Sequence, residues 1–470
     1  MGTTGITENP LRVAIVGSGP AGFYAAGALL KSKSHPDLCV QVDMYDRLPT
    51  PWGLVRGGVA PDHPNIKAVS RVYEKTAAHP EFRFYGNVEL GRDLGRRDLV
   101  DRYHAVIYAV GSQTDRRLGI PGEDLPGSWA ATEFVAWYNG HPNYRDLEFD
   151  LSHERAVVIG NGNVATDVAR MLALTRDELA ATDVADHALE VLAESKVREI
   201  VVLGRRGPAQ VAFTNPELLE LGEMSDADVF VDPGDVELDP LSKAFIESDE
   251  ASMTAKKNVE ILSGYAGREP TGKPRRIVLR FLVSPVEILG EDRVEGIRIC
   301  HNELVGDDSG AIRARPTDRF EEIGCGLVFR SIGYRGLPLE DLPFDDRRCV
   351  IPNEGGRILG DSGPLTGEYV VGWIKRGPTG IIGTNKRDAQ ETIELLLEDV
   401  DAGRLLEPAD PDRDSLDALL AERAPDHVTY AGWEAIDRAE KAAGEPHGRP
   451  RVKLCSFEEL LDAARERVSS

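Results

Sequence analysis

Two glycine-rich segments in the chain have the residue types and spacing of dinucleotide-binding turns. They are residues 17–22 (GSGPAG) and residues 160–165 (GNGNVA), and each follows a strand-like run. In such a turn the first glycine permits a tight bend and the second lets the backbone approach a pyrophosphate. The third position lets the following helix pack closely on the strand. The amino end of that helix faces the phosphates with its partial positive charge. Two such turns predict two nucleotide cofactors, between which electrons pass.

The charged residues that follow the next strand of each unit predict which nucleotide binds. Asp46 ends the strand-like run 40–45, and we expect it to accept a hydrogen bond from a ribose hydroxyl, although an ordinary surface carboxylate is the alternative. Arg205 and Arg206 follow the run 199–203, where an NAD site would carry an acid. Two guanidiniums can grip a 2′-phosphate, so this pair predicts a preference for NADPH over NADH; the alternative is a solvated loop pair.

Other candidate chemical groups are few. His63 and Glu217 are candidates for proton handling or positioning near a redox centre, although neither belongs to a motif of its own. The five cysteines are scattered, without a Cys-x-x-Cys pair or a Cys/His cluster. This pattern indicates reduced thiols, and it argues against a thiol relay, a bound iron–sulfur cluster and a metal site.

Composition excludes several classes of protein. The 470 residues suffice for roughly three domains. A net charge of −24 argues against general nucleic-acid binding. No apolar run approaches the roughly 20 residues of a membrane span, so we expect no membrane insertion. Residues 1–10 contain no Lys or Arg and resemble neither a secretory signal nor a transit peptide, which predicts a cytoplasmic protein.

Hydrophobic periodicity predicts the elements that must hold these groups. Helices are expected at 21–32, 65–78, 164–174 and 386–400, and a polar insert at 175–196. Strands are expected at 11–16, 40–45, 82–90, 105–110, 156–159, 199–203, 276–283, 294–304, 324–332 and 369–373.

Longer strings of residues, spread over nearly the whole chain, resemble one family. They are residues 16–23 (VGSGPAGF), 53–64 (GLVRGGVAPDHP), 159–165 (IGNGNVA), 204–208 (GRRGP) and 372–380 (GWIKRGPTG). The chain resembles adrenodoxin reductase and its bacterial relatives, the NADPH–ferredoxin reductases. Residues 444–450 (GEPHGRP) are similar to the bacterial branch.

The resemblance implies an α/β, glutathione-reductase-like fold with two Rossmann-like nucleotide-binding domains. Residues 1–112 and 333–470, which include a C-terminal helical tail, would form the FAD-binding domain, and residues 113–332 the NADPH-binding domain. The implied FAD contacts are Ala21, Asp46, Leu54, Val88, Trp373, Gly380, Ile381 and Ile382, in addition to Gly17, Gly19 and Gly22 of the glycine turn itself. The implied NADPH contacts are Asn161, Gly162, Asn163, Val164, Arg205, Arg206, Glu217 and Gly380. His63 and Glu217 would lie beside the flavin–nicotinamide region. Asp46 stands where the family often has Glu, which should weaken the ribose hydrogen bonds without removing FAD.

The expected activity is hydride transfer from NADPH to FAD, followed by single-electron transfer to a ferredoxin-type iron–sulfur protein. Three alternatives remain: a disulfide reductase, which needs a cysteine pair; a reductase subunit like that of glutamate synthase, which needs a cysteine-rich segment; and a nucleotide-sensing protein without turnover. Seven basic residues near the family strings are candidates for docking an acidic partner, unless they are scattered solvated charges. They are Arg56, Lys67, Arg71, Lys375, Arg376, Lys386 and Arg387.

Overall fold

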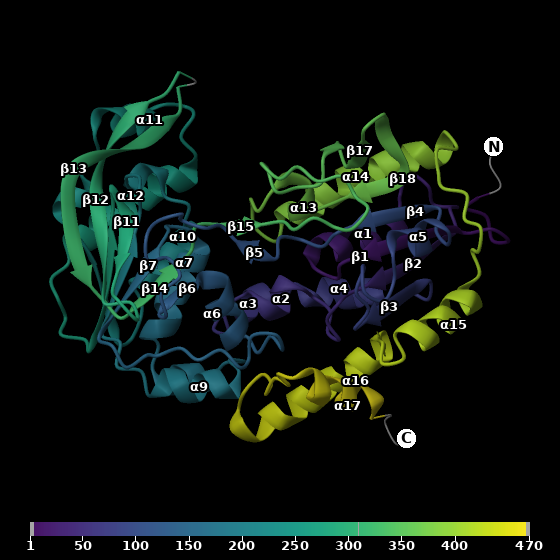
Figure 1. Ribbon diagram of the computed structural model, residues 1–470, viewed down its shortest axis with the longest axis horizontal. Coiled ribbons are helices and arrows are strands. Elements are labelled where there is room, and N and C mark those ends of the chain that lie inside the picture. The colour runs from purple at the N-terminus through teal and green to yellow at the C-terminus, as the bar shows by residue number, and fades with distance from the viewer. Residues whose placement is uncertain (1–3, 309, 467–470) are drawn as a thin grey trace. The chain divides into compact units, whose positions relative to one another are not determined.

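The computed structural model of the chain describes residues 4–308 and 310–466, and it divides into two compact units. Unit 1 contains the chain up to Val59, His63–Thr114 and the chain from Gly333 onward. Unit 2 contains Ala60–Asp62 and Asp115–Ile332. Figure 1 shows by colour that unit 1 draws on both ends of the chain, purple and yellow-green, whereas unit 2 comes from its middle.

The core of unit 1 is an eight-stranded sheet with the order β16-β17-β18-β4-β1-β2-β3-β19. Its central part is parallel, and β16, β17 and β19 pair antiparallel at its edges. All six residues of β1 are buried, as in a parallel strand covered on both faces. The bounds are β1 Leu11–Val16, β2 Val40–Tyr45, β3 Phe82–Gly86, β4 Ala105–Tyr108, β16 Asn353–Glu354, β17 Arg357–Gly360, β18 Gly363–Val370 and β19 Val428–Thr429.

Helices cover both faces of this sheet. Side chains of α1 (Pro20–Leu30), α14 (Thr384–Asp401), α16 (Tyr430–Gly444) and α17 (Phe457–Arg465) share one hydrophobic cluster with the sheet. Leu99 of α5 (Arg96–Val100) and two leucines of α15 (Arg413–Arg423) belong to the other. The helix expected over 65–78 is two helices, α3 (Pro64–Lys67) and α4 (Ser70–Ala77). The break arises because the hydrogen bonds of Val69, Arg71 and Val72 reach back three residues instead of four.

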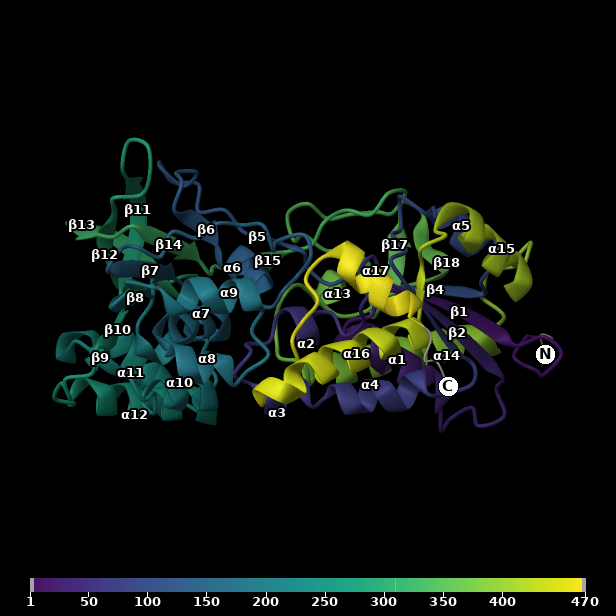
Figure 2. The same ribbon diagram turned by 90° about the horizontal axis from the view of Figure 1, so that it is seen from below.

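The C-terminal helices are tied to the segment after β2. Both outer nitrogens of Arg56, on α2 (Leu54–Gly57), bind the carboxylate of Glu440 on α16, at 2.8 and 2.5 Å. Arg451 binds the same carboxylate at 2.9 Å, and Leu454 N–H donates to it. Glu440 is fully buried; burial opposes its charge, but the two guanidiniums hold its pKa below the ordinary value. Figure 2 shows α16 and α17 in yellow.

Unit 2 has a six-stranded parallel sheet with the order β6-β14-β7-β8-β10-β9, and a separate antiparallel sheet, β11-β12-β13. The parallel strands are β6 Ser128–Ala130, β7 Arg155–Ile159, β8 Glu199–Leu203, β9 Ala227–Val231, β10 Arg275–Arg280 and β14 Leu327–Arg330. The antiparallel strands are β11 Val283–Leu289, β12 Gly296–Gly306 and β13 Ile312–Gly324.

The helices of unit 2 include two that lie within the expected polar insert, α8 and α9. Thr175 begins α8 with a capping box, in which its hydroxyl accepts from Glu178 N–H and the Glu178 carboxylate binds Thr175 N–H. The helices are α6 Ala131–Tyr138, α7 Asn163–Ala173, α8 Arg176–Ala180, α9 Asp186–Ala193, α10 Asn215–Leu221, α11 Pro240–Glu247 and α12 Met253–Ala266. In the described part of the chain, no helix combines the length and the apolar character needed to span a bilayer.

Candidate nucleotide-binding sites

The first glycine turn has the shape that a pyrophosphate requires. Gly17 has φ +109°, and a Cβ there would lie 2.5 Å from the carbonyl oxygen of Ala109. A Cβ on Gly22 would lie 2.1 Å from the carbonyl oxygen of Gly17, so the third glycine allows the close approach of α1. No atom lies within 4 Å of the position that a Cβ on Gly19 would take, and no side chain caps α1 there. The amino end of α1 is therefore open for an anion.

Asp46 joins this turn to the end of β2. One carboxylate oxygen accepts from Ser18 N–H and Ser18 Oγ, and the other accepts from Leu48 N–H. Burial raises the pKa of Asp46, and the hydrogen bonds from Ser18 and Leu48 oppose that rise. A carboxylate offers about four acceptor positions, so one stays open for a ribose hydroxyl. Val88 lies beside Asp46, because the Val88 N–H donates to the Asp46 carbonyl.

A loop in the left-handed backbone region places Leu54 next to the same turn. Trp52 and Gly53 have φ +83° and +50°, and Trp52 N–H donates to the Ser18 carbonyl. A Cβ on Gly53 would lie 2.8 Å from Gly19 Cα, so only glycine fits this approach. Leu54 then begins α2 with 37% of its surface exposed.

The C-terminal part of unit 1 brings Trp373 to the amino end of α1. A Cβ on Gly372 would lie 2.6 Å from Ala21 Cβ, and Trp373 begins α13 (Trp373–Arg376) directly after it. Among the described residues the buried Nε1 of Trp373 has no hydrogen-bond partner. An unpaired buried N–H is costly, so this donor fits a ligand acceptor.

Gly380, Ile381 and Ile382 form an open edge before α14. Gly380 has φ +79°, Ile381 is 61% exposed, and no side chain caps the amino end of α14. Two uncapped helix ends, an unpartnered indole N–H and an exposed apolar side chain therefore lie along the segments predicted to contact FAD. The residues present fit a flavin dinucleotide.

The second glycine turn, in unit 2, repeats the first with one change. Gly160 has φ +134°, and a Cβ there would lie 2.0 Å from the Ser331 carbonyl oxygen. Gly162 precedes α7 without a capping side chain. Ala165 takes the third glycine position and is fully buried, so a methyl group fits between helix and strand.

Two asparagines of this turn, Asn161 and Asn163, contact the neighbouring loops. Asn163 Oδ1 accepts from Thr214 N–H at 2.8 Å, and the Asn161 carbonyl accepts from Ala212 N–H at 3.0 Å. A Cβ on Gly204 would lie 2.9 Å from Asn161 Nδ2, so the turn that carries Arg205 meets the glycine turn. Val164 directly follows Asn163 in the first turn of α7 and is half-buried.

Arg205 and Arg206 follow β8 at this edge. Within the part of the chain that the structure describes, no carboxylate forms an ion pair with either guanidinium, although most arginines of this acidic chain have one. The pKa of Arg206 is lowered by burial and then by the nearby charges of Arg205 and Arg313. Two guanidiniums without an ion pair, with a third cation nearby, favour an anion. The sequence does not reveal Arg313, because β13 reaches this turn only through tertiary structure.

Glu217 lies in unit 2 on α10, buried, and its carboxylate accepts from Arg170 Nη1 at 3.1 Å. Arg170 also pairs with Asp62, Asp167 and Glu220. Arg170 was not predicted from the sequence, because nothing in a helical arginine signals that Asp62 and two carboxylates of α10 will meet it. His63 lies in unit 1, where its carbonyl accepts from Ile66 and Lys67 N–H at the start of α3.

Three of the seven candidate docking cations have internal roles, so the expectation that they receive a partner is wrong. Arg56 binds the buried Glu440. Lys375 is 9% exposed and lies 3.1 Å from the carboxylate of Asp388. Arg376 donates to Asn385 Oδ1 at 2.8 Å and to the Thr379 carbonyl.

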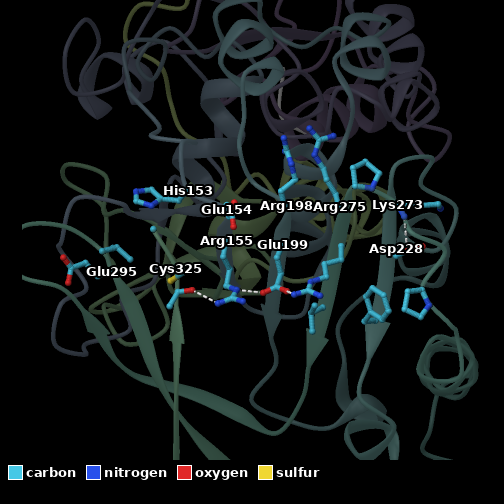
Figure 3. A pocket seen from close by; sticks show the side chains of 18 of the residues that line it. His153, Glu154, Arg155, Arg198, Glu199, Asp228, Lys273, Arg275, Glu295 and Cys325 are labelled. Carbon is cyan, nitrogen blue, oxygen red and sulfur yellow. Dashed lines mark hydrogen bonds and ion pairs between the residues drawn. The ribbon is translucent and has the colours of Figure 1, made fainter.

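A cavity of about 1150 Å³ in unit 2 contains none of the predicted site residues. Figure 3 shows it at the amino ends of the parallel strands, where Arg155 pairs with Glu199 and the Arg198 and Arg275 side chains lie next to each other. Arg275 donates to the carbonyls of Ala173 and Leu174 at the end of α7. Nucleotides bind at the carboxyl ends of such sheets, so this cavity is not the dinucleotide site.

Comparison with known proteins places this geometry in a family. The family model described as pyridine nucleotide-disulphide oxidoreductase matches residues 11–202. The chain is 54% identical to the NADPH-ferredoxin reductase FprA of Mycobacterium leprae over 451 residues, 96% of this chain and 97% of that protein. It is 42% identical over 468 residues to the mitochondrial NADPH:adrenodoxin oxidoreductase of Salvelinus fontinalis, 97% of this chain and 91% of that protein.

A solved structure agrees with the sequence relatives. Mycobacterium tuberculosis FprA in complex with NADPH superposes with a TM-score of 0.91 at 52% identity, covering 97% of this chain and all of that one. The expected α/β fold with two Rossmann-like units is confirmed. The chain therefore belongs to the NADPH–ferredoxin reductase family that includes FprA and adrenodoxin reductase.

Proposed function

We propose that the chain binds FAD in unit 1 and NADPH in unit 2, oxidises NADPH and passes single electrons to a ferredoxin-type iron–sulfur protein. The observation that carries the proposal is the turn of Arg205 and Arg206 beside the second glycine turn, where no described carboxylate pairs with either guanidinium. The other unit of the chain has a glycine turn of its own. The relatives named NADPH-ferredoxin reductase and adrenodoxin oxidoreductase support it.

The chain's own contribution is binding and orientation. When bound, FAD accepts a hydride from NADPH and supplies two electrons one at a time. The open amino end of α1 would hold the FAD pyrophosphate, Asp46 a ribose hydroxyl, and Trp373 Nε1 an acceptor of the cofactor. In unit 2, Arg205 and Arg206 would bind the 2′-phosphate and the turn at Gly162 the pyrophosphate. Positioning of the reacting atoms within roughly 3–3.5 Å provides most of the catalysis.

His63 and Glu217 are proposed to tune the reaction without being essential. Hydride transfer requires no protein acid or base, and Glu217 is already paired with Arg170. Single Ala variants should slow flavin reduction or weaken NADPH binding, and should still turn over. Complete inactivity with both nucleotides bound would show an obligatory proton transfer.

The proposal includes the partner and the compartment. The partner is a ferredoxin-type protein that brings its own cluster, because no Cys-x-x-Cys pair or Cys/His cluster occurs in the sequence, and no nucleic acid is involved. The cytoplasm is the proposed compartment, and it suits five cysteines that the structure describes as free thiols.

Anaerobic titration with NADPH tests the proposal. The purified protein should be yellow with one FAD per chain, NADPH should bleach the flavin, and an added ferredoxin-type protein should then be reduced. NADH at the same concentration is the control and should act much more slowly. A protein that takes up no FAD would contradict the flavin site. A flavin that NADPH does not bleach would favour the nucleotide-sensing alternative.

A further inference from the structure

The turn that carries Arg205 and Arg206 is fixed by the antiparallel sheet of unit 2. Asn302, on β12, donates from Nδ2 to the Arg205 carbonyl at 2.8 Å. Leu282, just before β11, donates from its N–H to the Arg206 carbonyl at 3.2 Å. Both contacts use the backbone of the turn. They therefore fix its direction and leave both guanidiniums available.

Asn302 is held in one orientation. It lies at an irregularity of the β12–β13 ladder, where the register shifts between Cys300 and Asn302. Its Nδ2 also donates to Ser284 Oγ at 2.8 Å, its own N–H donates to the Leu282 carbonyl at 2.6 Å, and it is 7% exposed. Leu282 has φ +55°, a conformation that these contacts stabilise. A register shift that re-aims a buried amide is a typical feature beside functional sites.

The same sheet brings a third guanidinium to the turn. Arg313 on β13 pairs in register with Val305 of β12. The preceding residue, Leu304, has Cδ1 3.7 Å from the position of a Cβ on Gly207, so this end of β12 packs on the turn. Arg313 lies close enough to Arg206 to disfavour its charge. Asp307 accepts from Arg313 Nε at 2.7 Å and orients it.

We infer that the antiparallel sheet determines coenzyme specificity: Asn302 positions the arginine turn, and Arg313 supplies a third guanidinium to the 2′-phosphate. The inference rests on the proposed NADPH site. A phosphate monoester carries about −1.5 to −2 charges at pH 7. Two guanidiniums therefore only just neutralise it, and Arg313, which Asp307 orients, adds further charge-assisted donors. The bound dianion in turn relieves the repulsion among the three arginines.

Arg315 provides a matched control for Arg313. It lies two residues along β13, on the same face of the strand. It pairs with Glu303 as Arg313 pairs with Asp307, and the two side chains are 61% and 67% exposed. Arg315 is not among the charges that act on Arg206. The two variants remove the same charge and a similar ion pair, and differ in distance from the arginine turn.

Calorimetry on the FAD-loaded protein, with adenosine 2′,5′-bisphosphate and AMP as probes, tests the role of Arg313. Arg313→Ala should weaken binding of the bisphosphate about three- to tenfold and leave AMP binding unchanged. Arg315→Ala should change neither. Unchanged bisphosphate binding in Arg313→Ala, or an equal loss in Arg315→Ala, would overturn the assignment.

Steady-state kinetics test the role of Asn302. Asn302→Leu should raise KM for NADPH more than Arg313→Ala does, because it releases the backbone that carries two arginines, while kcat and the KM for NADH stay unchanged. Ser284→Ala removes one hydrogen bond of the Asn302 amide. It should raise the ratio of KM for NADPH to KM for NADH by less than Asn302→Leu does. A KM ratio that neither variant shifts would overturn the positioning role.

The variant Arg205→Ala/Arg206→Ala separates failure of this inference from failure of the proposed function. If it keeps full affinity for the bisphosphate, the proposed NADPH site is wrong. If it loses that affinity while Arg313→Ala and Asn302→Leu keep it, the site is right and the inference alone is wrong.

Discussion

Ser18 binds one carboxylate oxygen of Asp46 twice, with its N–H at 2.9 Å and its Oγ at 2.5 Å. Ser18 is the second residue of the glycine turn, and Asp46 is the first residue after β2. The carboxylate expected to bind a ribose therefore also fixes the shape of the turn that would bind the pyrophosphate. One side chain orders two parts of the same cofactor site.

Asp46→Ala should weaken FAD binding at least tenfold, because it removes charge-assisted bonds of about 1.5–3 kcal/mol each. Ser18→Ala is the milder control, since it keeps the backbone N–H bond. Flavin fluorescence during reconstitution of the deflavinated protein measures both affinities. Equal FAD affinity in Asp46→Ala and the parent protein would show that the turn holds its shape without the carboxylate.

Replacing both Arg205 and Arg206 by Ala should raise KM for NADPH about 100-fold and leave KM for NADH little changed. The estimate takes about 1.5 kcal/mol for each charge-assisted bond and about 1.4 kcal/mol for each tenfold change. The readout is initial rates with ferricyanide as acceptor. Equal losses for the two coenzymes would disprove the 2′-phosphate assignment.

No cysteine should be catalytic. Burial raises the pKa of Cys325 to about 12 and that of Cys455 to about 11, so both remain protonated thiols at neutral pH. A variant with all five cysteines changed to Ser should be less stable, yet once folded and loaded with FAD it should oxidise NADPH at the parental rate. Loss of flavin reduction in that folded variant would revive the disulfide-reductase alternative.

Binding of the partner should respond to the four remaining candidate docking cations. Arg71, Lys386 and Arg387 are exposed, and Lys67 lies one turn before Arg71. If an acidic ferredoxin docks on α3 and α4, Lys67→Glu/Arg71→Glu should raise its KM and leave the KM for NADPH unchanged. The matched control is Lys386→Glu/Arg387→Glu on α14.

Ionic strength provides a second readout of docking. Ferredoxin-dependent turnover should fall with salt more than ferricyanide turnover, because the screening length shrinks from about 10 Å at 0.1 M to about 3 Å at 1 M. Salt-insensitive turnover that neither variant changes would indicate an apolar docking surface.

Acid should destabilise unit 1 through His104. Burial, and then the charge of Arg12, lower the pKa of His104 to about 4, and its Nδ1 accepts from Arg12 N–H. The unfolded chain binds this proton near pH 6.5, so the contribution of neutral His104 to the free energy of unfolding is fully present above that pH. This contribution is lost as pH falls toward 4, by about 3 kcal/mol in all.

His104→Gln should be less stable at pH 7 but should lose less stability between pH 7 and pH 5. Thermal release of flavin fluorescence measures this change, with the exposed His447→Gln as control. A parental pH dependence in His104→Gln would assign the proton uptake to another group.

The sequence predicted those parts of the fold that local patterns encode. Both glycine turns and the strands before them are read from a few adjacent residues, and Gly17 and Gly160 have the conformations that the pattern requires. The burial of Lys375 and Arg56 was not predictable, because their partners Asp388 and Glu440 come from other segments. Arg170 and Arg313 were missed for the same reason.

The ion pair between Arg56 and Glu440 bears on the order in which the two units can fold during synthesis. Residues 115–332 form nearly all of unit 2 and leave the ribosome together, so this unit can fold early. Unit 1 cannot bury its Glu440 carboxylate, or fix the segment around Leu54, until almost the entire chain has emerged. A chain that stops before residue 440 therefore contains all of unit 2 but lacks the carboxylate that binds Arg56 in unit 1.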